Sequence, residues 1–258
     1  MNLKRRQIYY DPWPFMVVDN FLGKNDILRI KNEILNYKNY DDKVMTNRKR
    51  INKGSENFQY LTKKSKAVKK LYNQINNEKF YKKIRNFFKD EKLDWIPSEK
   101  FSSYSKDFFG EQKFSFKEKI IKGLSFLNLI KTSMNLDIDF SVSEKGYHRP
   151  AHRDRETRVM NFLIYLNSFN KKFGGNLEIH KSKFFKHNEK DYPRFPEKGE
   201  TRLVKKIPPK AGRMIIFLST PDSYHAAEKI YKDKLKRVFI YGSFSLNKKV
   251  AWTKNKFK

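Results

Sequence analysis

The alternation of apolar and polar residues in the second half of the chain predicts β-strands. Residues 137–143 alternate strictly, and residues 159–166, 213–218 and 238–244 are short apolar runs. Turn-forming residues (Gly, Ser, Thr, Pro and Asp) flank the run at 213–218 on both sides. Short runs of this kind are typical of strands that are buried in a core. The pattern therefore predicts a mainly β core at residues 136–246.

The first half of the chain predicts one strand and then helices. Residues 15–18 form the expected strand, and Asp19 or Asn20 can cap the helix that follows. Apolar positions recur in this helix at helical spacing: Ile27, Leu28, Ile30, Ile34 and Leu35. Ser65 can cap a second helix, and residues 81–88 are expected to form a third helical piece. The apolar side of the second helix comprises Val68, Leu71, Ile75 and Phe80.

The remaining segments have weaker patterns. Residues 38–64 are polar and basic and are expected to form an irregular loop near the substrate mouth. Residues 89–115 are expected to form irregular structure over the core, and residues 116–134 fit either a helix or a strand. Residues 181–210 are too long and basic for a minimal hairpin, and no role is assigned to them. The basic tail, Lys248–Lys258, is expected to fray.

Length and composition indicate one folded domain. The chain has 258 residues, of which 16% are aromatic, and this is enough to bury a core despite 33% charged residues. We divide it into a helical or irregular support region (1–135), a metal-binding β core (136–246) and a basic tail (247–258). No run is apolar and long enough for a signal peptide or a membrane span, so a cytoplasmic protein without membrane contact is expected. Cysteine is absent, so any bound metal must be held by His, Asp or Glu.

The formal net charge of +30 has two interpretations. The 58 basic and 28 acidic residues indicate either a surface for an anionic partner, such as nucleic acid, or compositional drift towards lysine. A surface that binds nucleic acid usually clusters its charges and interleaves exposed aromatic residues. The lysines here are scattered over the whole length, which favours drift, and nucleic acid is kept as the less favoured partner.

Two histidines and an aspartate form a candidate metal site. Non-haem Fe(II) oxygenases hold their metal with two imidazoles and one carboxylate and leave three positions open. His152 and Asp154 are two residues apart, so in extended backbone both side chains reach the same side. His225 follows the predicted strand at 213–218 and a turn. His148 is expected to lie at the surface or beside a ligand, and His180 and His187 are expected in solvent.

An arginine at the start of the last predicted strand is the candidate anion-binding residue. Residues 237, 239 and 241 share one face of this strand, and Arg237 inside a barrel is costly unless it meets an anion. A guanidinium forms two parallel hydrogen bonds with a carboxylate, which suits a dicarboxylic acid. Lys236 is the neighbouring alternative, and the strand phase favours Arg237.

These residues together resemble the Fe(II)/2-oxoglutarate-dependent dioxygenases, and most of all their prolyl 4-hydroxylase-like branch. The motifs that carry the resemblance span residues 147–245: His152-x-Asp154, His225, Arg237, Tyr165 with Asn167, Gly174-Gly175 and the strand at 209–217. Residues 11–22 also resemble the entry strand of this group. The basic residue falls slightly later after the distal histidine than in several relatives.

The resemblance implies a fold, a set of ligands and a reaction. Short strands with ligands on three of them predict a double-stranded β-helix, or jelly roll, buttressed by helices. His152, Asp154 and His225 would bind Fe(II), and Arg237 with Tyr165 would bind 2-oxoglutarate. The implied reaction uses O2 and hydroxylates an unactivated C–H bond while 2-oxoglutarate becomes succinate and CO2, with ascorbate as a reductant.

The substrate stays open between several classes. The resemblance implies a peptidyl prolyl or other amino-acid side chain, and a small metabolite, such as a sugar or a nucleotide-linked compound, fits equally well. The carboxylate of Asp154 favours hydroxylation, because related halogenases lack it. The nucleic-acid dealkylases carry a second arginine where this chain has Ser243. An inactive jelly-roll module that binds an anionic partner is a further alternative, and the sequence indicates no oligomeric state.

Overall fold

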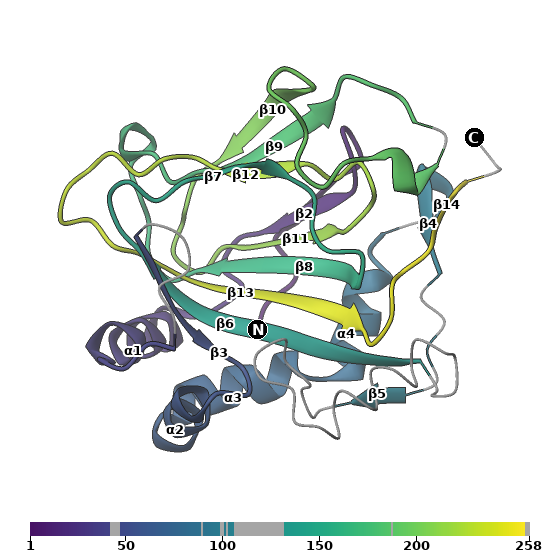
Figure 1. The fold of residues 1–258 in the computed structure, drawn as a ribbon. Coiled ribbons are helices and arrows are strands. Elements are labelled where there is room, and N and C mark those ends of the chain that lie inside the picture. The colour runs from purple at the N-terminus through teal and green to yellow at the C-terminus, as the bar shows by residue number, and fades with distance from the viewer. Residues whose placement is uncertain are drawn as a thin grey trace.

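The computed structural model (Figure 1) is a mainly β structure whose helices lie along one side. It describes residues 1–41, 47–88, 90–98, 101, 103–105, 132–186 and 188–255. Within these residues the strands form sheets of eight, four and two strands. The four-stranded sheet lies across the interior from the eight-stranded sheet, and the helices pack on the opposite face of the large sheet. This arrangement confirms the predicted jelly roll with supporting helices.

The large sheet contains the strands that the apolar pattern predicted. Its order is β1 (Arg6–Tyr9), β2 (Phe15–Val18), β11 (Met214–Leu218), β8 (Arg158–Tyr165), β13 (Arg237–Leu246), β6 (Ser133–Ser143) and β3 (Arg48–Asn52). A further short strand, β5 (Ser103–Ser105), runs parallel to β6. β13 lies between β6 and β8, antiparallel to both, so its two faces meet the helices on one side and the interior on the other.

The four-stranded sheet closes the opposite side of the interior. Its order is β10 (Thr201–Ile207), β9 (Leu177–Ser182), β12 (His225–Ala227) and β7 (Arg149–His152). The chain enters β9 through Gly174, at φ 76°, where a Cβ atom would lie 1.9 Å from the carbonyl oxygen of Lys229. Only glycine permits both this backbone conformation and this close approach. The predicted double glycine therefore sets where β9 begins.

Four helices are described, and they pack on the outer face of the large sheet. They are α1 (Lys24–Asn36), α2 (Glu56–Lys64), α3 (Lys66–Ile75) and α4 (Glu78–Arg85). Three short 3-10 turns also occur: η1 (Asp90–Lys92), η2 (Lys171–Phe173) and η3 (Glu189–Asp191). Ser65 caps α3 as predicted, by accepting a hydrogen bond from the Val68 N–H. Among the described residues, no helix combines the length and the apolar character that crossing a membrane requires.

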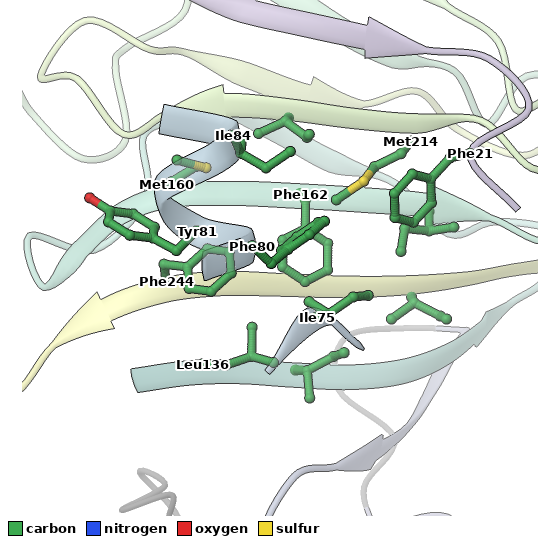
Figure 2. Close-up of a cluster of buried hydrophobic side chains, with 14 of the residues drawn as sticks. Phe21, Ile75, Phe80, Tyr81, Ile84, Leu136, Met160, Phe162, Met214 and Phe244 are labelled. Atoms are coloured by element: carbon green, nitrogen blue, oxygen red, sulfur yellow. The ribbon is translucent and has the colours of Figure 1, made fainter. Parts of the chain in front are cut away.

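Aromatic rings fill the space between the helices and the large sheet (Figure 2). Phe162 of β8 and Phe244 of β13 have ring centroids 6.0 Å apart, and Phe80 and Tyr81 of α4 pack on Phe244. Gly242 makes room for this layer, because a Cβ atom at that position would lie 2.2 Å from the Phe162 ring. The absence of a side chain at Gly242 of β13 thus leaves room for the Phe162 ring of the neighbouring strand β8.

Several expectations about the first half of the chain were wrong. Asp19 and Asn20 do not cap the first helix, since Gly23 occupies the N-cap and Asp19 pairs with Arg213 instead. Residues 38–64 are not one irregular loop: they contain β3 and α2, whose side chains complete the sheet edge and the helical layer. Residues 42–46 lie outside the described residues.

Other segments also differ from the expectations in particular ways. Phe80 belongs to α4 and not to the second helix, because Asn76 and Asn77 end one helix and cap the next. Residues 106–131, which include most of the undecided 116–134 segment, lie outside the described residues. Residues 89–115 hold the short strands β4 (Trp95–Pro97) and β5. The tail does not fray up to residue 255, since β14 (Trp252–Lys254) pairs with β4 and buries Trp252.

Candidate active site

The three predicted metal ligands meet at the interior end of the small sheet. His152 ends β7 and His225 begins β12, and these two residues are directly paired across the strands. Asp154 follows two residues after His152. One ligand atom from each residue lies within 4.8 Å of the others, and all three side chains are buried. Spacing in the sequence predicted the pair at 152 and 154, and strand pairing brings in His225.

Hydrogen bonds fix the two imidazole rings in the form that can bind a metal. Nδ1 of His152 lies 2.9 Å from the Pro150 carbonyl oxygen, and Nδ1 of His225 lies 3.0 Å from that of Ser223. A carbonyl oxygen only accepts, so each Nδ1 carries the proton and each Nε2 presents a lone pair. Burial first, and then the neighbouring cations, hold the pKa of His152 well below its usual value, and burial lowers the pKa of His225. Both rings are therefore neutral at pH 7.

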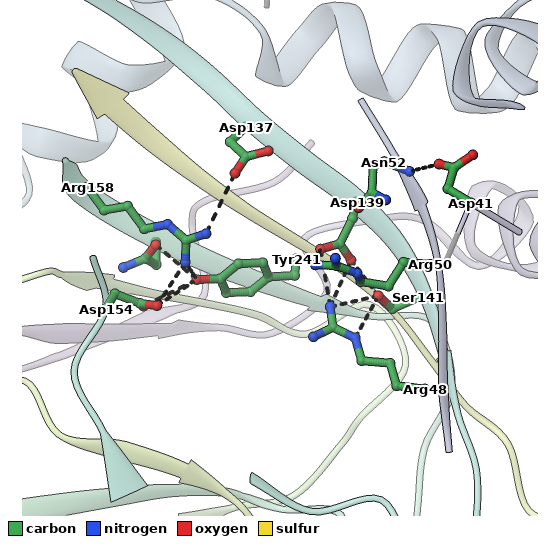
Figure 3. Close-up of polar contacts among 11 residues, drawn as sticks. Asp41, Arg48, Arg50, Asn52, Asp137, Asp139, Ser141, Asp154, Arg158 and Tyr241 are labelled. Atoms are coloured by element: carbon green, nitrogen blue, oxygen red, sulfur yellow. Dashed lines mark hydrogen bonds and ion pairs between the residues drawn. The ribbon is translucent and has the colours of Figure 1, made fainter. Parts of the chain in front are cut away.

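The carboxylate of Asp154 is held ionised by an arginine and a tyrosine (Figure 3). Nη1 of Arg158 donates to Oδ1 of Asp154 at 2.8 Å, and the Tyr241 hydroxyl lies 3.2 Å from both carboxylate oxygens. Burial alone would raise the pKa of Asp154, but the Arg158 guanidinium beside it holds that pKa below its usual range. Oδ2 points towards His225, 3.5 Å from its Nε2. Neither Arg158 nor Tyr241 was singled out from the sequence.

Arg237 lies inside the barrel, as the strand phase predicted. It is 3% exposed, and it donates to the Gly175 carbonyl oxygen at 2.6 Å and to Ser143 Oγ at 3.1 Å. Its Cζ atom lies 5.0 Å from the ring centre of Tyr147. Lys236, the alternative, points outward: its side chain is 53% exposed and lies near Glu144. Geometry therefore favours Arg237 as the residue that meets an anion within the barrel.

Two buried tyrosines accompany Arg237. Tyr165 is 1% exposed and pairs across strands with Phe239, whose ring lies 4.7 Å from the Arg237 guanidinium carbon. Burial raises the pKa of Tyr165. Burial would also raise the pKa of Tyr147, but Arg48, Arg237 and Arg149 lower it on balance. Tyr147 was not chosen from the sequence as a site residue, although it opens the stretch that contains the metal ligands.

A second buried arginine lies next to the same ring. Arg48 of β3 donates to Asp139 at 2.9 Å and to Ser141 at 2.8 Å, and its Cζ lies 5.1 Å from the centre of Phe239 (Figure 3). The sequence interpretation missed it because residues 38–64 were expected to form a loop. The sequence does alternate here, as expected of a strand. Arg48, Arg50 and Asn52 face the interior polar residues of β6, and Ile51, which precedes Asn52, is fully buried.

The remaining histidines and Ser243 are not part of the metal cluster. His148 is exposed, as expected. His180 is not simply solvated, since its side chain is 14% exposed and lies 3.5 Å from Glu178. His187 lies outside the described residues. Ser243 is buried, and its hydroxyl lies 2.9 Å from that of Ser245.

The donor set fits a divalent transition metal such as Fe(II). Two neutral imidazoles and one carboxylate supply three ligands and a single negative charge, which is the set that non-haem iron enzymes use on one face of the metal. The interior between this cluster and Arg237 is lined by apolar rings of a separate core cluster that includes Tyr165, Phe217 and Phe239. Phe217 packs on His225, with ring centroids 4.7 Å apart. The site thus has the Asp154 carboxylate at one end and the Arg237 guanidinium at the other, and both are buried.

Sequence and structure comparisons agree with this geometry. Residues 138–244 match the sequence model of the 2OG-Fe(II) oxygenase superfamily. No curated protein sequence matches the chain. HygX from Streptomyces hygroscopicus, solved with nickel, 2-oxoglutarate and hygromycin B, has a TM-score of 0.50 at 9% identity, with 90% of this chain and 82% of that chain covered. This likeness shows the fold.

Two prolyl hydroxylase structures are also similar at low identity. The prolyl 4-hydroxylase of Pseudomonas putida has a TM-score of 0.47 at 14% identity, with 90% of this chain and 91% of that chain covered. The viral collagen prolyl hydroxylase of Paramecium Bursaria Chlorella virus-1 has a TM-score of 0.44 at 12% identity, with coverage of 91% and 97%. The segment that matches the model of the 2OG-Fe(II) oxygenase superfamily, residues 138–244, is also the segment that holds the buried His-Asp-His cluster.

Proposed function

We propose that this protein is an Fe(II)- and 2-oxoglutarate-dependent dioxygenase that hydroxylates an unactivated C–H bond. The cosubstrate would be decarboxylated to succinate and CO2 in the same turnover. The observation that carries this proposal is the meeting of His152, Asp154 and His225 within 4.8 Å, in an interior that also holds the buried guanidinium of Arg237.

Each residue has a separate task in this proposal. The Nε2 atoms of His152 and His225 and one oxygen of Asp154 would hold Fe(II), which with 2-oxoglutarate supplies the oxidising chemistry once bound. Arg158 and Tyr241 keep Asp154 ionised and restrict its rotation, so that one oxygen stays directed at His225. This support makes a carboxylate ligand available at the metal without a change of geometry when the metal binds.

The far carboxylate of 2-oxoglutarate would meet Arg237. Hydrogen bonds to Gly175 and Ser143 hold the guanidinium in place before the cosubstrate arrives. Tyr165 or Tyr147 can donate a further hydrogen bond there, because both rings lie beside Arg237 and burial favours partners for their hydroxyls. The buried rings of Phe217 and Phe239 belong to the apolar cluster that also holds Tyr165, and they would keep water away from a cosubstrate bound there.

An anaerobic titration of the apoprotein with Fe(II) and 2-oxoglutarate tests the proposal. We expect the weak visible absorption band of the iron complex with 2-oxoglutarate in the wild type and in His148→Ala, since His148 is exposed and outside the cluster. His225→Ala should lose the band while circular dichroism shows a folded protein. Absence of the band in folded wild-type protein would overturn the proposal.

Admitting oxygen to the same samples tests the reaction. Succinate should form in the wild type and not in Asp154→Ala. The sequence resemblance indicates a peptidyl prolyl or other amino-acid side chain, or a small metabolite, as substrate, and succinate release over a panel of both classes is the screen for it.

A further inference from the structure

The arginines of the chain gather around the candidate site, while its lysines do not. The 58 basic residues comprise 44 lysines and 14 arginines. Seven of the 14 arginines lie in or around the site: Arg48, Arg50, Arg149, Arg155, Arg158, Arg194 and Arg237. Drift towards lysine explains a scattered surface charge, but it does not explain why the cations at one place are arginines. A planar guanidinium differs from an ammonium in its forked hydrogen bonding to oxyanions.

Four of these arginines are not used in holding the proposed cofactors, and we call them the arginine rim: Arg50, Arg149, Arg155 and Arg194. Arg149 pairs across strands with Ala227, which is two residues from His225 on the same face of β12. A register shift separates this pair from the His225–His152 pair, and Arg149 lies close enough to both histidines to lower the pKa of each. Arg155 follows Asp154 directly in the chain.

The other two rim residues reach the site from distant segments. The Arg194 carbonyl oxygen accepts a hydrogen bond at 2.9 Å from the backbone N–H of Arg153, which lies between His152 and Asp154 in the chain. The Arg194 Nε atom is buried and has no hydrogen-bond partner among the described residues. Arg50 faces the interior beside Ser141, and its Nη1 lies 3.8 Å from Asp139 (Figure 3).

An exposed aromatic ring lies within the rim. Phe195 is 55% exposed, and its ring is nearly parallel to that of His152, with centroids 6.1 Å apart. The Arg194 guanidinium carbon lies 5.1 Å from the centre of the same ring. An apolar ring of this size is usually covered, so its position against a metal-binding histidine makes it a surface for the body of a substrate.

The rim arginines lie close enough to their neighbours to influence one another's pKa. Burial and the neighbouring Arg158 and Arg194 lower the pKa of Arg155, and burial and Arg149 lower that of Arg194. Three aspartates form ion pairs with some of the seven arginines: Asp137, Asp139 and Asp154. The two charges of Fe(II) and the two of 2-oxoglutarate would cancel, so loading the site would not by itself change the charge at the rim.

We propose that the substrate carries an oxyanion, a phosphate or carboxylate group, that the arginine rim binds beside Phe195. This inference rests on the proposed dioxygenase function and names the chemical class of its substrate. The guanidinium groups would hold the oxyanion at the mouth, and Phe195 would contact the part of the substrate between that group and the metal. Positioning through a remote charge brings one C–H bond to the metal and keeps the others away.

Binding of defined anions to the protein loaded anaerobically with Fe(II) and 2-oxoglutarate tests the proposal. The probes are pyrophosphate, citrate, adenosine 5′-monophosphate and its uncharged counterpart adenosine. Their binding is measured by calorimetry and by the change in the visible absorption band. We expect at least one of the anions to bind and to shift the band, and adenosine to leave it unchanged. Comparing the affinity for pyrophosphate with that for citrate shows whether the rim prefers phosphate or carboxylate groups.

Rim variants and a matched surface variant complete the test. Arg149→Gln and Arg194→Gln should weaken anion binding at least tenfold, and Arg194→Lys should restore only part of it because the fork is lost. Arg202→Gln, at an exposed arginine of β10, should bind as the wild type does. Equal weakening by Arg202→Gln, or binding that Arg149→Gln and Arg194→Gln leave unchanged, would show non-specific attraction and overturn the proposal.

Two outcomes separate this inference from the proposed function. A normal visible band without any anion binding would overturn the oxyanion proposal and leave the dioxygenase function standing. Absence of the band itself would overturn both. Tight binding of a single-stranded oligonucleotide, with weak binding of every small anion, would also overturn the proposal. The arginine rim would then bind a nucleic-acid polymer and not a small oxyanion.

Discussion

The two faces of strand β13 are both buried, but they have different composition and different tasks. On the helix side, Val238, Ile240 and Phe244 pack into the main apolar cluster. On the interior side, Arg237 bonds to Ser143 of β6, and Tyr241 bonds to Asn161 of β8 and to Asp154. Burial therefore does not distinguish a core from a site. A site differs from a core in its buried polar groups, whose burial costs free energy. In the site they form a connected hydrogen-bond network around the candidate metal ligands.

Two of the buried arginines on the interior face have a carboxylate as counter-ion. Arg48 pairs with Asp139, and Arg158 pairs with Asp154. Removing one member of such a pair leaves an uncompensated charge, which costs far more than the pair contributes. Changes on the interior face should therefore alter ligand binding and catalysis, and also stability where they break an ion pair, whereas changes on the helix face should alter stability alone.

The largest expected effect concerns the ligand carboxylate on the interior side. Asp154→Ala should lower succinate formation on the order of a thousandfold or more, equivalent to about 4 kcal/mol of barrier. The physical reason is the loss of one of three metal ligands and of the negative charge that balances Arg158. Turnover is measured by succinate release, and Asp233→Ala, at an exposed aspartate, serves as the control. A turnover close to that of the control would refute the assignment.

Removing a ring from the helix side should unfold the protein more easily and leave the site intact. Phe162→Ala removes a fully buried side chain that packs on Phe244, so the free energy of unfolding should fall by about 3–5 kcal/mol. Phe185→Ala, at a 68% exposed ring, should change it by less than about 0.5 kcal/mol. Chemical denaturation gives both values. The visible band of the loaded Phe162→Ala protein should be unchanged, and its loss would contradict the separation of the two faces.

A third change asks which basic residue binds the cosubstrate. Arg237→Gln should raise the KM for 2-oxoglutarate by roughly 30- to 100-fold, about 2–3 kcal/mol, because a charge-assisted hydrogen bond is lost in a buried site. Lys236→Gln should leave the KM unchanged, since this side chain is exposed. Initial rates over a range of 2-oxoglutarate concentrations decide between them, and the reverse result would move the role to Lys236.

The smallest effect concerns an ion pair outside both faces. Asp19 receives hydrogen bonds from Arg213 and Lys210, which lower the pKa of Asp19 to about 2. A carboxyl with a depressed pKa in the folded state adds stability above its unfolded pKa and loses it as the pH falls towards 2. Because the carboxylate is partly exposed, the contribution is about 1 kcal/mol.

Unfolding at several pH values measures this contribution. Asp19→Asn should be less stable than the wild type at pH 7, and the difference should vanish between pH 4 and pH 2. A difference that persists at pH 2 would show that Asp19 acts through packing and not through its charge.

Local patterns predicted most of the second half of the fold. The strands β6, β8, β11 and β13 followed from alternation and apolar runs, since their side chains have to face two buried layers. The first half was harder. β3 has the sequence RKRIN, which is polar and basic, and only its pairing with β6 makes such residues interior. The cap at Asp19 failed for a similar reason, because a tertiary ion pair with Arg213 competes for that carboxylate.

The sequence by itself predicted the candidate metal ligands, the candidate anion-binding arginine and the mainly β core. Two of them depend on short-range spacing: His152 and Asp154 are two positions apart, and the phase of one strand places Arg237. Only the tertiary structure decided which cations surround the site. Arg48 and Asp139 are 91 residues apart, and Arg194 belongs to a segment without a predicted role. Strand pairing across a closed barrel joins such distant segments, and no periodicity within a single segment records it.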